Sequence, residues 1–165
     1  MIMMKTLLLI RHAEAQWDAF GQADIQRTLT ERGIEQVHDI ANSMKGESLI
    51  PNAIFSSSAK RAEMTALLLV PDIDFAADKI QWCDDLYLAE AEHLFATAQQ
   101  ADDAIQTLAI IAHNPGLSEL AHYLLPNPTN GMSPANVVAI TWPVERWQDI
   151  SAKTGALRAH LQPNI

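Results

Sequence analysis

Two short runs of uninterrupted apolar residues constrain the fold of this chain most strongly. Residues 7–10 are LLLI and residues 108–112 are LAIIA, so neither run has a polar position on either face of an extended strand. A strand with one face in water alternates apolar and polar residues, whereas a strand of a parallel sheet is covered on both faces. The two runs therefore predict interior strands of a largely parallel sheet.

Stretches with helical spacing lie between these runs and several further short strands. Ile34, Val37 and Met44 recur at helical intervals after Thr30, a good N-cap, and the pattern stops at Gly46. Other helices are expected over residues 59–70, ending before Pro71, over 90–106, and after Asn114 as N-cap, with Pro115 as the first helical residue. Other strands are expected over 53–55, within 75–82, and over 136–141 and 156–161, with a long loop over 13–29. This order predicts a three-layer α/β/α fold with a mainly parallel mixed sheet, in a single domain over residues 1–165.

Composition excludes several functional classes. The 165 residues include 11 Lys and Arg against 20 Asp and Glu, and this net charge of −9 argues against nucleic-acid binding, which depends on neutralising phosphates. The single Cys83 leaves no internal disulfide and no CxxC metal site. No segment reaches the roughly 18 apolar residues of a membrane helix, and the apolar run after Lys5 is too short for a signal peptide. We therefore expect a cytoplasmic protein without a membrane partner.

Functional side chains follow three of the expected strands at their carboxyl ends. The first run continues into Arg11 and His12, the run at 108–112 continues into His113, and the strand at 53–55 leads through three serines to Arg61. Ligand sites of open α/β sheets form at this edge. A neutral imidazole attacks phosphorus well, and guanidinium groups neutralise the phosphoryl oxygens. The pattern indicates phosphoryl transfer, although each of these residues taken alone also fits an ordinary loop or ion-pair role.

The same residues resemble the signatures of the histidine phosphatase superfamily. Four similar blocks occur in the family's order and with its spacing, and the resemblance as a whole extends over nearly all of the chain. The blocks are Leu8-Leu9-Ile10-Arg11-His12-Ala13-Glu14, Asp24-x-x-Arg27-x-Leu29-Thr30-x-x-Gly33, Ser57-Ser58-Ala59-Lys60-Arg61-Ala62, and Ala112-His113-Asn114-Pro115-Gly116. The short length and the run Asp85-Leu86-Tyr87-Leu88-Ala89 look most like the SixA-type phosphohistidine phosphatases. The resemblance implies the phosphoglycerate mutase-like fold. It also implies that His12 is the nucleophile, and that Arg11, Arg61, His113 and Arg27 hold the phosphoryl group.

The chain departs from the family pattern at two positions, and it offers no clear general acid. Ala13 replaces the usual Gly and Ser58 stands where Pro is common, but neither change removes a reacting group. Glu90 is the acid candidate, although it equally fits the N-terminus of a helix, where a carboxylate suits the helix dipole. Glu14 is expected to pair with an arginine, and Trp17 fits either the pocket rim or plain exposure.

The weak acid signal favours one class of substrate. An imidazole leaves phosphorus far more readily than an alkoxide does, because its conjugate acid titrates near neutrality. The favoured substrate is therefore a phosphohistidine on a protein, hydrolysed through a phosphohistidine intermediate on His12 without a cofactor or metal. Two alternatives stay open: a phosphatase of small phosphoesters, with a phosphoglycerate mutase-like enzyme as its less favoured form, and a non-catalytic module that binds phosphoproteins.

Overall fold

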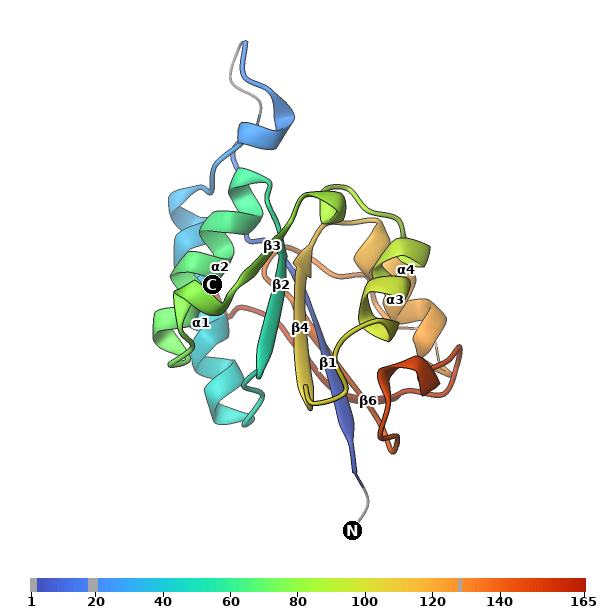
Figure 1. Cartoon of the computed structure of the whole chain (residues 1–165). Helices are drawn as coiled ribbons and strands as arrows, with labels where there is room; N and C mark the ends of the chain where they lie inside the picture. Colours follow the sequence, from blue (N-terminus) through green and yellow to red (C-terminus); the bar gives the residue numbers. More distant parts are fainter. Residues whose placement is uncertain (1–2, 18–20, 128) are drawn as a thin grey trace.

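The computed structural model describes residues 3–17, 21–127 and 129–165 and consists of one six-stranded sheet between two layers of helices (Figure 1). The strands are β1 (Lys5–Arg11), β2 (Ala53–Ser57), β3 (Gln81–Cys83), β4 (Thr107–Ala112), β5 (Val137–Trp142) and β6 (Ala156–Leu161). The α-helices are α1 (Glu31–Gly46), α2 (Lys60–Asp72), α3 (Ala91–Gln99) and α4 (Gly116–Leu124). Short 3-10 helices are η1 (Asp24–Gln26), η2 (Ala77–Lys79), η3 (Asp84–Leu86) and η4 (Trp147–Asp149).

The sheet is mixed, with its parallel strands grouped at one side. The strand order is β3-β2-β4-β1-β5-β6. β1, β2, β3 and β4 pair in parallel, whereas β5 runs antiparallel to β1 and β6 antiparallel to β5. The carboxyl ends of the parallel strands therefore meet at one edge, which is the upper edge in Figure 1. The expected three-layer α/β fold is confirmed.

Alternate residues of β1 enter two different cores. Leu7 and Leu9 pack in the cluster formed with α3 and α4, whereas Leu8 and Ile10 pack in the cluster formed with α1 and α2. Because adjacent side chains of a strand point to opposite faces, an uninterrupted apolar run is what a strand covered on both sides needs. The helices lie on both faces of the sheet accordingly (Figure 1).

Helix boundaries differ from the sequence-based expectations at three places. Pro71 lies inside α2 rather than beyond its end, as the exposed penultimate residue of the helix. α3 ends at Gln99 rather than at residue 106, and α4 begins at Gly116 with Pro115 at its N-cap. The expected cap of α1 is confirmed, because Thr30 Oγ1 accepts a hydrogen bond of 2.9 Å from Gly33 N.

The remaining strand and loop predictions agree closely with the structure. The minor strand expected within 75–82 is β3 at Gln81–Cys83. The loop at 13–29 contains η1 and one isolated bridge, between Ala15 and Leu29, and its residues 18–20 lie outside the described part of the chain, as do residues 1–2 and 128. In the described ranges, no helix has the length and apolar character to cross a membrane.

Candidate active site

The sheet order places the predicted functional residues at one point of the molecule. β4 lies between β1 and β2, and Arg11 at the end of β1 is directly opposite Ala112 at the end of β4. His12 and His113, one residue further on each strand, have ring centroids 5.2 Å apart. The two histidines therefore lie side by side because two parallel strands end in the same register.

A pocket of about 380 Å³ opens at these strand ends. Its walls combine the two histidines, three arginines and residues of the following loops: Arg11, His12, Trp17, Asp24, Arg27, Arg61, Leu88, His113 and Asn114. The structure thus brings together Arg11, His12, Arg61, His113 and Arg27. Trp17 lies at the rim with 88% of its surface exposed, and the Arg27 guanidinium carbon lies 5.6 Å from the centre of its ring.

His12 is held as a neutral imidazole with a defined orientation. Its Nδ1 lies 2.8 Å from the carbonyl oxygen of Ala13, which accepts only, so the ring proton is on Nδ1 and the lone pair is on Nε2. Burial is the main cause that lowers the pKa of His12 to about 4, and the charges of Arg61 and Arg11 lower it further. The hydrogen bond to Ala13 acts in the opposite direction. An unprotonated Nε2 is the form that attacks an electrophile.

His113 is also neutral, and one of its nitrogens has no partner. Its Nε2 lies 2.8 Å from Ser57 Oγ, while Nδ1 is buried without a hydrogen bond to any described residue. Burial is the main cause that lowers the pKa of His113 to about 3, and the neighbouring His12 and Arg61 add to it. A nitrogen left in this state is suited to bonding a group that enters the pocket.

Two arginines are anchored beside the histidines. Arg11 donates from Nη1 to the carbonyl oxygen of Met132 at 3.0 Å, and burial together with Arg61 lowers its pKa. Arg61, only 3% exposed, donates from Nη1 to the Asp24 carbonyl oxygen at 2.9 Å and from Nη2 to Asp24 Oδ2 at 3.2 Å. The Nε of each arginine is buried and has no partner among the described residues. Both guanidiniums therefore keep hydrogen-bonding capacity for an anion.

Asp24 is a member of the site that the sequence argument did not single out. Its carboxylate accepts hydrogen bonds from Arg61, from Arg27 at 3.1 Å and from the Tyr87 hydroxyl. The Tyr87 hydroxyl, followed by Arg27 and Arg61, lowers the pKa of Asp24 to about 2. The spacing of three residues between Asp24 and Arg27 was the available signal, because it suits an ion pair within one turn.

The other acidic residues lie outside the pocket. Glu90 occupies the N-cap position of α3 and lines a neighbouring hollow, so the structure does not bring it together with the histidines. Glu14 Oε2 accepts from Arg32 at 3.3 Å, as expected of a local ion pair. Asp85 pairs with His93 at 2.8 Å, and Asp84 is exposed. Within the described ranges, no group of three His, Cys, Asp or Glu side chains is arranged to hold a metal.

The two departures from the family pattern leave the site intact. Ala13 is fully buried, its φ is not positive, and its N–H donates to Thr65 Oγ1 at 3.0 Å. An alanine therefore adopts the backbone conformation found here without strain. Ser58 precedes Ala59, the N-cap residue of α2, and does not line the pocket. Asn114 connects the start of α4 to the segment at Met132. Its Oδ1 accepts a hydrogen bond from Ser118 N at 3.1 Å, and its Nδ2 donates to the Met132 carbonyl oxygen.

Parts of the sequence are similar to known proteins. Residues 7–102 match the histidine phosphatase superfamily, branch 1. An uncharacterised chloroplastic protein of Arabidopsis thaliana is 27% identical over 128 residues, which cover 73% of this chain and 59% of that protein. The metal-independent phosphoserine phosphatase of the same plant is 40% identical over 65 residues, which cover 38% of this chain and 27% of the relative. The matched segments thus span less than two thirds of either relative.

Solved structures share the fold along the whole length. A SixA-type protein from Nakamurella multipartitia superimposes with a TM-score of 0.81 at 19% identity, covering 98% of both chains. The protein histidine phosphatase SixA, solved in complex with tungstate, gives a TM-score of 0.80 at 20% identity, covering 96% of this chain and 97% of that chain. With the match over residues 7–102, the strand-end histidines and arginines identify this chain as a member of the histidine phosphatase superfamily, with a SixA-like fold.

Proposed function

We propose that this chain is a phosphatase that accepts a phosphoryl group on His12 and releases it to water, with a phosphohistidine on a protein as its substrate. One observation carries the proposal. Three buried side-chain polar atoms have no hydrogen-bond partner in the described part of the chain, and all three belong to this pocket: Arg11 Nε, Arg61 Nε and His113 Nδ1. Buried polar atoms are rarely left unpaired, so three of them on residues that line one pocket support a site built for a polyvalent anion.

The geometry supports a two-step reaction. In the first step, the substrate imidazole carries a proton on its second ring nitrogen. The lone pair of His12 Nε2 attacks phosphorus, the bond from phosphorus to the substrate nitrogen breaks, and the substrate leaves as a neutral imidazole. Arg11, Arg61 and His113 stabilise the three equatorial oxygens of the transferred group. In the second step, water attacks phosphorus, the bond to Nε2 breaks, and the proton of the water passes to the released phosphate. His12 returns to its neutral form.

The acids around the pocket support an imidazole as the leaving group. Asp24 is the one carboxyl group among the described lining residues, and a pKa of about 2 keeps it ionised at neutral pH. An ionised carboxylate cannot give a proton to a departing alkoxide, whereas an imidazole leaves without strong acid assistance. The proposal therefore gives Glu90 no acid role and favours phosphohistidine over phosphate esters.

A phosphatase of small phosphoesters is the second candidate, because the Arabidopsis thaliana relative that is 40% identical is a phosphoserine phosphatase. A panel of one phosphohistidine protein, phosphoserine and p-nitrophenyl phosphate separates the two. We expect kcat/KM on the phosphohistidine protein to be at least about a hundredfold higher than on phosphoserine, whose alkoxide leaving group needs a proton. This factor is the lower bound of the advantage that general acid assistance gives. Equal or higher kcat/KM on phosphoserine would favour the second candidate.

The nucleophile is tested by His12→Ala, with His38→Ala as the matched control. His38 is an exposed histidine of α1 whose Nδ1 pairs with Asp72, away from the pocket. We expect His12→Ala to lose at least about 10⁴-fold in kcat, as enzymes that act through a covalent intermediate do. Acid-labile phosphate should be trapped on the wild type and on His38→Ala, but not on His12→Ala. Turnover that persists in His12→Ala would contradict the proposal, and phosphate binding without turnover in the wild type would indicate a non-catalytic binding module.

A further inference from the structure

Two further hollows lie next to the candidate pocket along the molecular surface. Leu88, which lines the pocket, also lines an adjacent hollow of about 550 Å³ together with Glu90 and Pro115. That hollow in turn shares Ala91, Glu92 and Glu119 with a groove of about 580 Å³ between α3 and α4. We call the two hollows together the α3/α4 track. The shared residues place the track next to the pocket, with Leu88 at the boundary between them.

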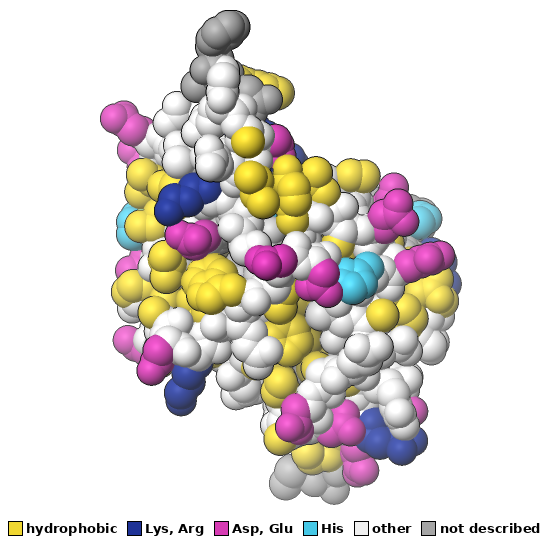
Figure 2. Space-filling model, turned by 45° about the horizontal axis from the view of Figure 1, so that its top comes forward, with side chains coloured by type: hydrophobic (Ala, Val, Ile, Leu, Met, Phe, Trp, Pro, Cys, Tyr) yellow, Lys and Arg dark blue, Asp and Glu magenta, His cyan; other side chains and the backbone are white. Residues whose placement is uncertain are grey.

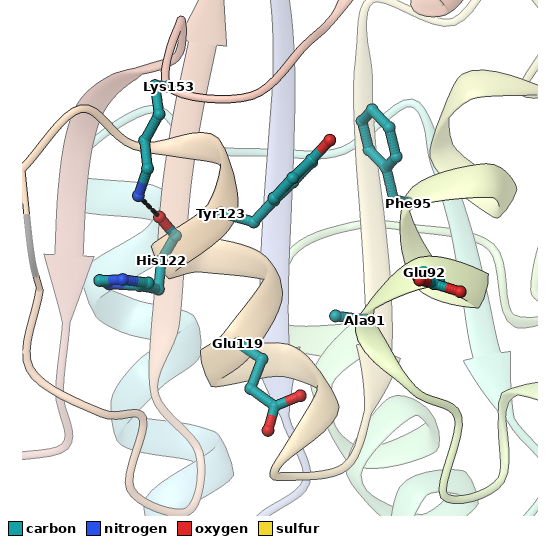
Figure 3. A pocket seen from close by; sticks show the side chains of 7 residues that line it. All are labelled: Ala91, Glu92, Phe95, Glu119, His122, Tyr123 and Lys153. Atoms are coloured by element: carbon teal, nitrogen blue, oxygen red, sulfur yellow. Dashed lines mark hydrogen bonds between the residues drawn. The ribbon is translucent and has the colours of Figure 1, made fainter.

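The far end of the α3/α4 track has an aromatic wall. Phe95 of α3 and Tyr123 of α4 approach each other across the groove, with ring centroids 5.3 Å apart at an interplanar angle of 70° (Figure 3). Tyr123 is 44% exposed although its ring is large and mostly apolar. At the groove edge, Lys153 donates from Nζ to the His122 carbonyl oxygen. Partly exposed aromatic rings in a groove of this kind commonly anchor a partner.

The middle of the track is acidic. Glu90, Glu92 and Glu119 are exposed, line the hollow next to the pocket, and form no ion pair with any residue that the structure describes. Acidic side chains are also spread more widely than Lys and Arg over the face that carries the strand ends (Figure 2). The sign of the charge thus reverses over a short path, from the arginines of the pocket to the glutamates of the track.

We propose that the α3/α4 track docks the segment of the phosphoprotein substrate that flanks its phosphorylated side chain. This inference rests on the proposed function. The phosphoryl group enters the arginine pocket, Lys or Arg residues of the segment lie against Glu90, Glu92 and Glu119, and an apolar side chain packs on Phe95 and Tyr123. The three regions of the surface require an anion, a cation and an apolar group in that order.

The dimensions fit a peptide segment. Tyr123 lies seven residues beyond Gly116 on α4, which is about 10 Å along the helix axis. An extended chain covers that length in roughly three residues, so the basic and apolar groups belong to the immediate neighbourhood of the phosphorylated residue. A second copy of this chain is a poor occupant, because two chains with a net charge of −9 each repel one another and the track is itself acidic.

Peptides phosphorylated on one histidine test the docking surface. One peptide has Lys residues next to the phosphohistidine and Leu three residues away. The second has Glu in place of Lys, and the third has Ser in place of Leu. With the wild-type protein we expect kcat/KM to be about tenfold higher for the Lys/Leu peptide than for either of the others. Each value is divided by kcat/KM on p-nitrophenyl phosphate, which is too small to reach the track.

Charge reversal on the protein provides the matched test. The double variant Glu92→Lys/Glu119→Lys should lose the preference for the Lys/Leu peptide and gain activity on the Glu peptide. Tyr123→Ala should lose the preference for Leu over Ser. Glu35→Lys is the control, because Glu35 is exposed on α1, on the opposite face of the sheet, and its substitution should leave both preferences unchanged.

The outcomes separate this inference from the proposed function. If all three peptides are hydrolysed with equal kcat/KM, or if the double variant keeps the wild-type preference, the track is not the docking surface while the phosphohistidine activity stands. If none of the peptides is hydrolysed although p-nitrophenyl phosphate is, the proposed substrate is wrong, and the docking inference falls with it.

Discussion

The Ser57 hydroxyl is the hydrogen-bond partner of His113 Nε2. Ser57 Oγ accepts a hydrogen bond from Ala59 N at 3.2 Å and lies 2.8 Å from His113 Nε2. We infer that the hydroxyl donates its own proton to Nε2. With Nε2 as acceptor, the ring proton of neutral His113 is on Nδ1, the buried atom that has no partner in the described part of the chain. Ser57 is therefore a positioning residue that supplies the pocket with one more donor.

Ser57→Ala should impair turnover through this contact. Removal of the hydroxyl leaves Nε2 buried without a partner, and such a loss costs about 1–3 kcal/mol, so we expect kcat to fall about 5- to 150-fold. KM should change less, because Arg11 and Arg61 still hold the substrate. Steady-state kinetics on the phosphohistidine protein measures both. Ser56→Ala is the matched control, because the Ser56 hydroxyl donates to the Ser57 carbonyl oxygen. An equal loss in the two variants would indicate damage to β2 rather than to His113.

The lowered pKa of His12 predicts a neutral nucleophile across the physiological range. With a pKa of about 4, the imidazole stays unprotonated down to about pH 5, whereas an unperturbed histidine is protonated below about pH 6.5. The ¹⁵N chemical shifts of His12 should therefore hold the values of the neutral tautomer with the proton on Nδ1 from pH 8 to about pH 5. The same resonances in urea-unfolded protein should titrate near pH 6.5. A midpoint of 6.5 in the folded protein would contradict the desolvated site.

At the scale of the element, α1 packs closely against the loop that follows His12, and the contact is made at Gly33. A Cβ atom added at Gly33 would lie 2.2 Å from the carbonyl oxygen of Glu14, closer than any real contact allows. The Glu14 backbone is also held by Gln36, whose Oε1 accepts from Glu14 N at 2.9 Å. The glycine is thus needed for a close approach between helix and loop rather than for an unusual φ.

Gly33→Ala should destabilise the protein, although alanine is the better helix former. Relief of the overlap with Glu14 requires a backbone shift that we expect to cost about 1–3 kcal/mol, more than the ~1 kcal/mol gained in helix propensity. Gly46 is the matched control, since an added Cβ there meets nothing within 4 Å and Gly46→Ala should leave stability unchanged or raise it slightly. Urea unfolding measures both variants. Equal stability of Gly33→Ala and the wild type would contradict the close packing.

The sequence pattern predicted the elements well and some of their ends poorly. Apolar periodicity locates strands and helices because it reports burial, which the sheet imposes along whole elements. Boundaries depend on single contacts. α3 stops at Gln99 where the expected helix ran to 106, and Asp102 Oδ1 then accepts from Ala104 N at 2.8 Å in a turn that competes with helix continuation. Pro71 is accommodated because, next to the end of α2, it removes one hydrogen bond from the last turn only.

At the scale of the whole molecule, the site was predictable to the extent that it belongs to strand ends. Arg11 is the last residue of β1, and His12 and His113 directly follow β1 and β4. Their proximity therefore needed only that β1 and β4 be neighbours, which the sheet order confirms. Asp24 was not predicted as a site residue because it lies in the long loop, where apolar residues show no regular spacing. Its partners, Arg61 and Tyr87, are 37 and 63 residues away in sequence. Such contacts are fixed by the tertiary fold rather than by local pattern.

Net charge and local charge have opposite signs in this molecule. The chain carries −9 overall, yet Arg11, Arg27 and Arg61 line one pocket with a single carboxylate among its described residues. Phosphate chemistry responds to the field inside the pocket, where fixed charges act over a few ångströms. The acidic remainder of the surface disfavours the approach of acidic macromolecules, which agrees with the basic flanking residues proposed above for the substrate.

The two buried histidines should make the whole molecule sensitive to mild acid. In the folded state the pKa is lowered to about 4 for His12 and about 3 for His113, while both titrate near 6.5 in the unfolded chain. Between these values the unfolded chain binds protons that the folded chain does not, so the free energy of unfolding falls as the pH falls from 6.5 toward 4. Each histidine contributes on the order of 3 kcal/mol to this loss by pH 4.

His12→Gln removes one of the two titrating groups and should reduce the loss of unfolding free energy in mild acid. We expect the free energy of unfolding, measured by urea denaturation, to drop about 2 kcal/mol less in His12→Gln than in the wild type between pH 7 and about pH 4.5. The difference between the two proteins isolates the histidine, because the carboxylates titrate in both. An identical drop would mean that His12 is protonated in the folded state at pH 4.5. The Nε2 lone pair would then be unavailable for attack in mild acid, and the site would owe its reactivity to something other than desolvation.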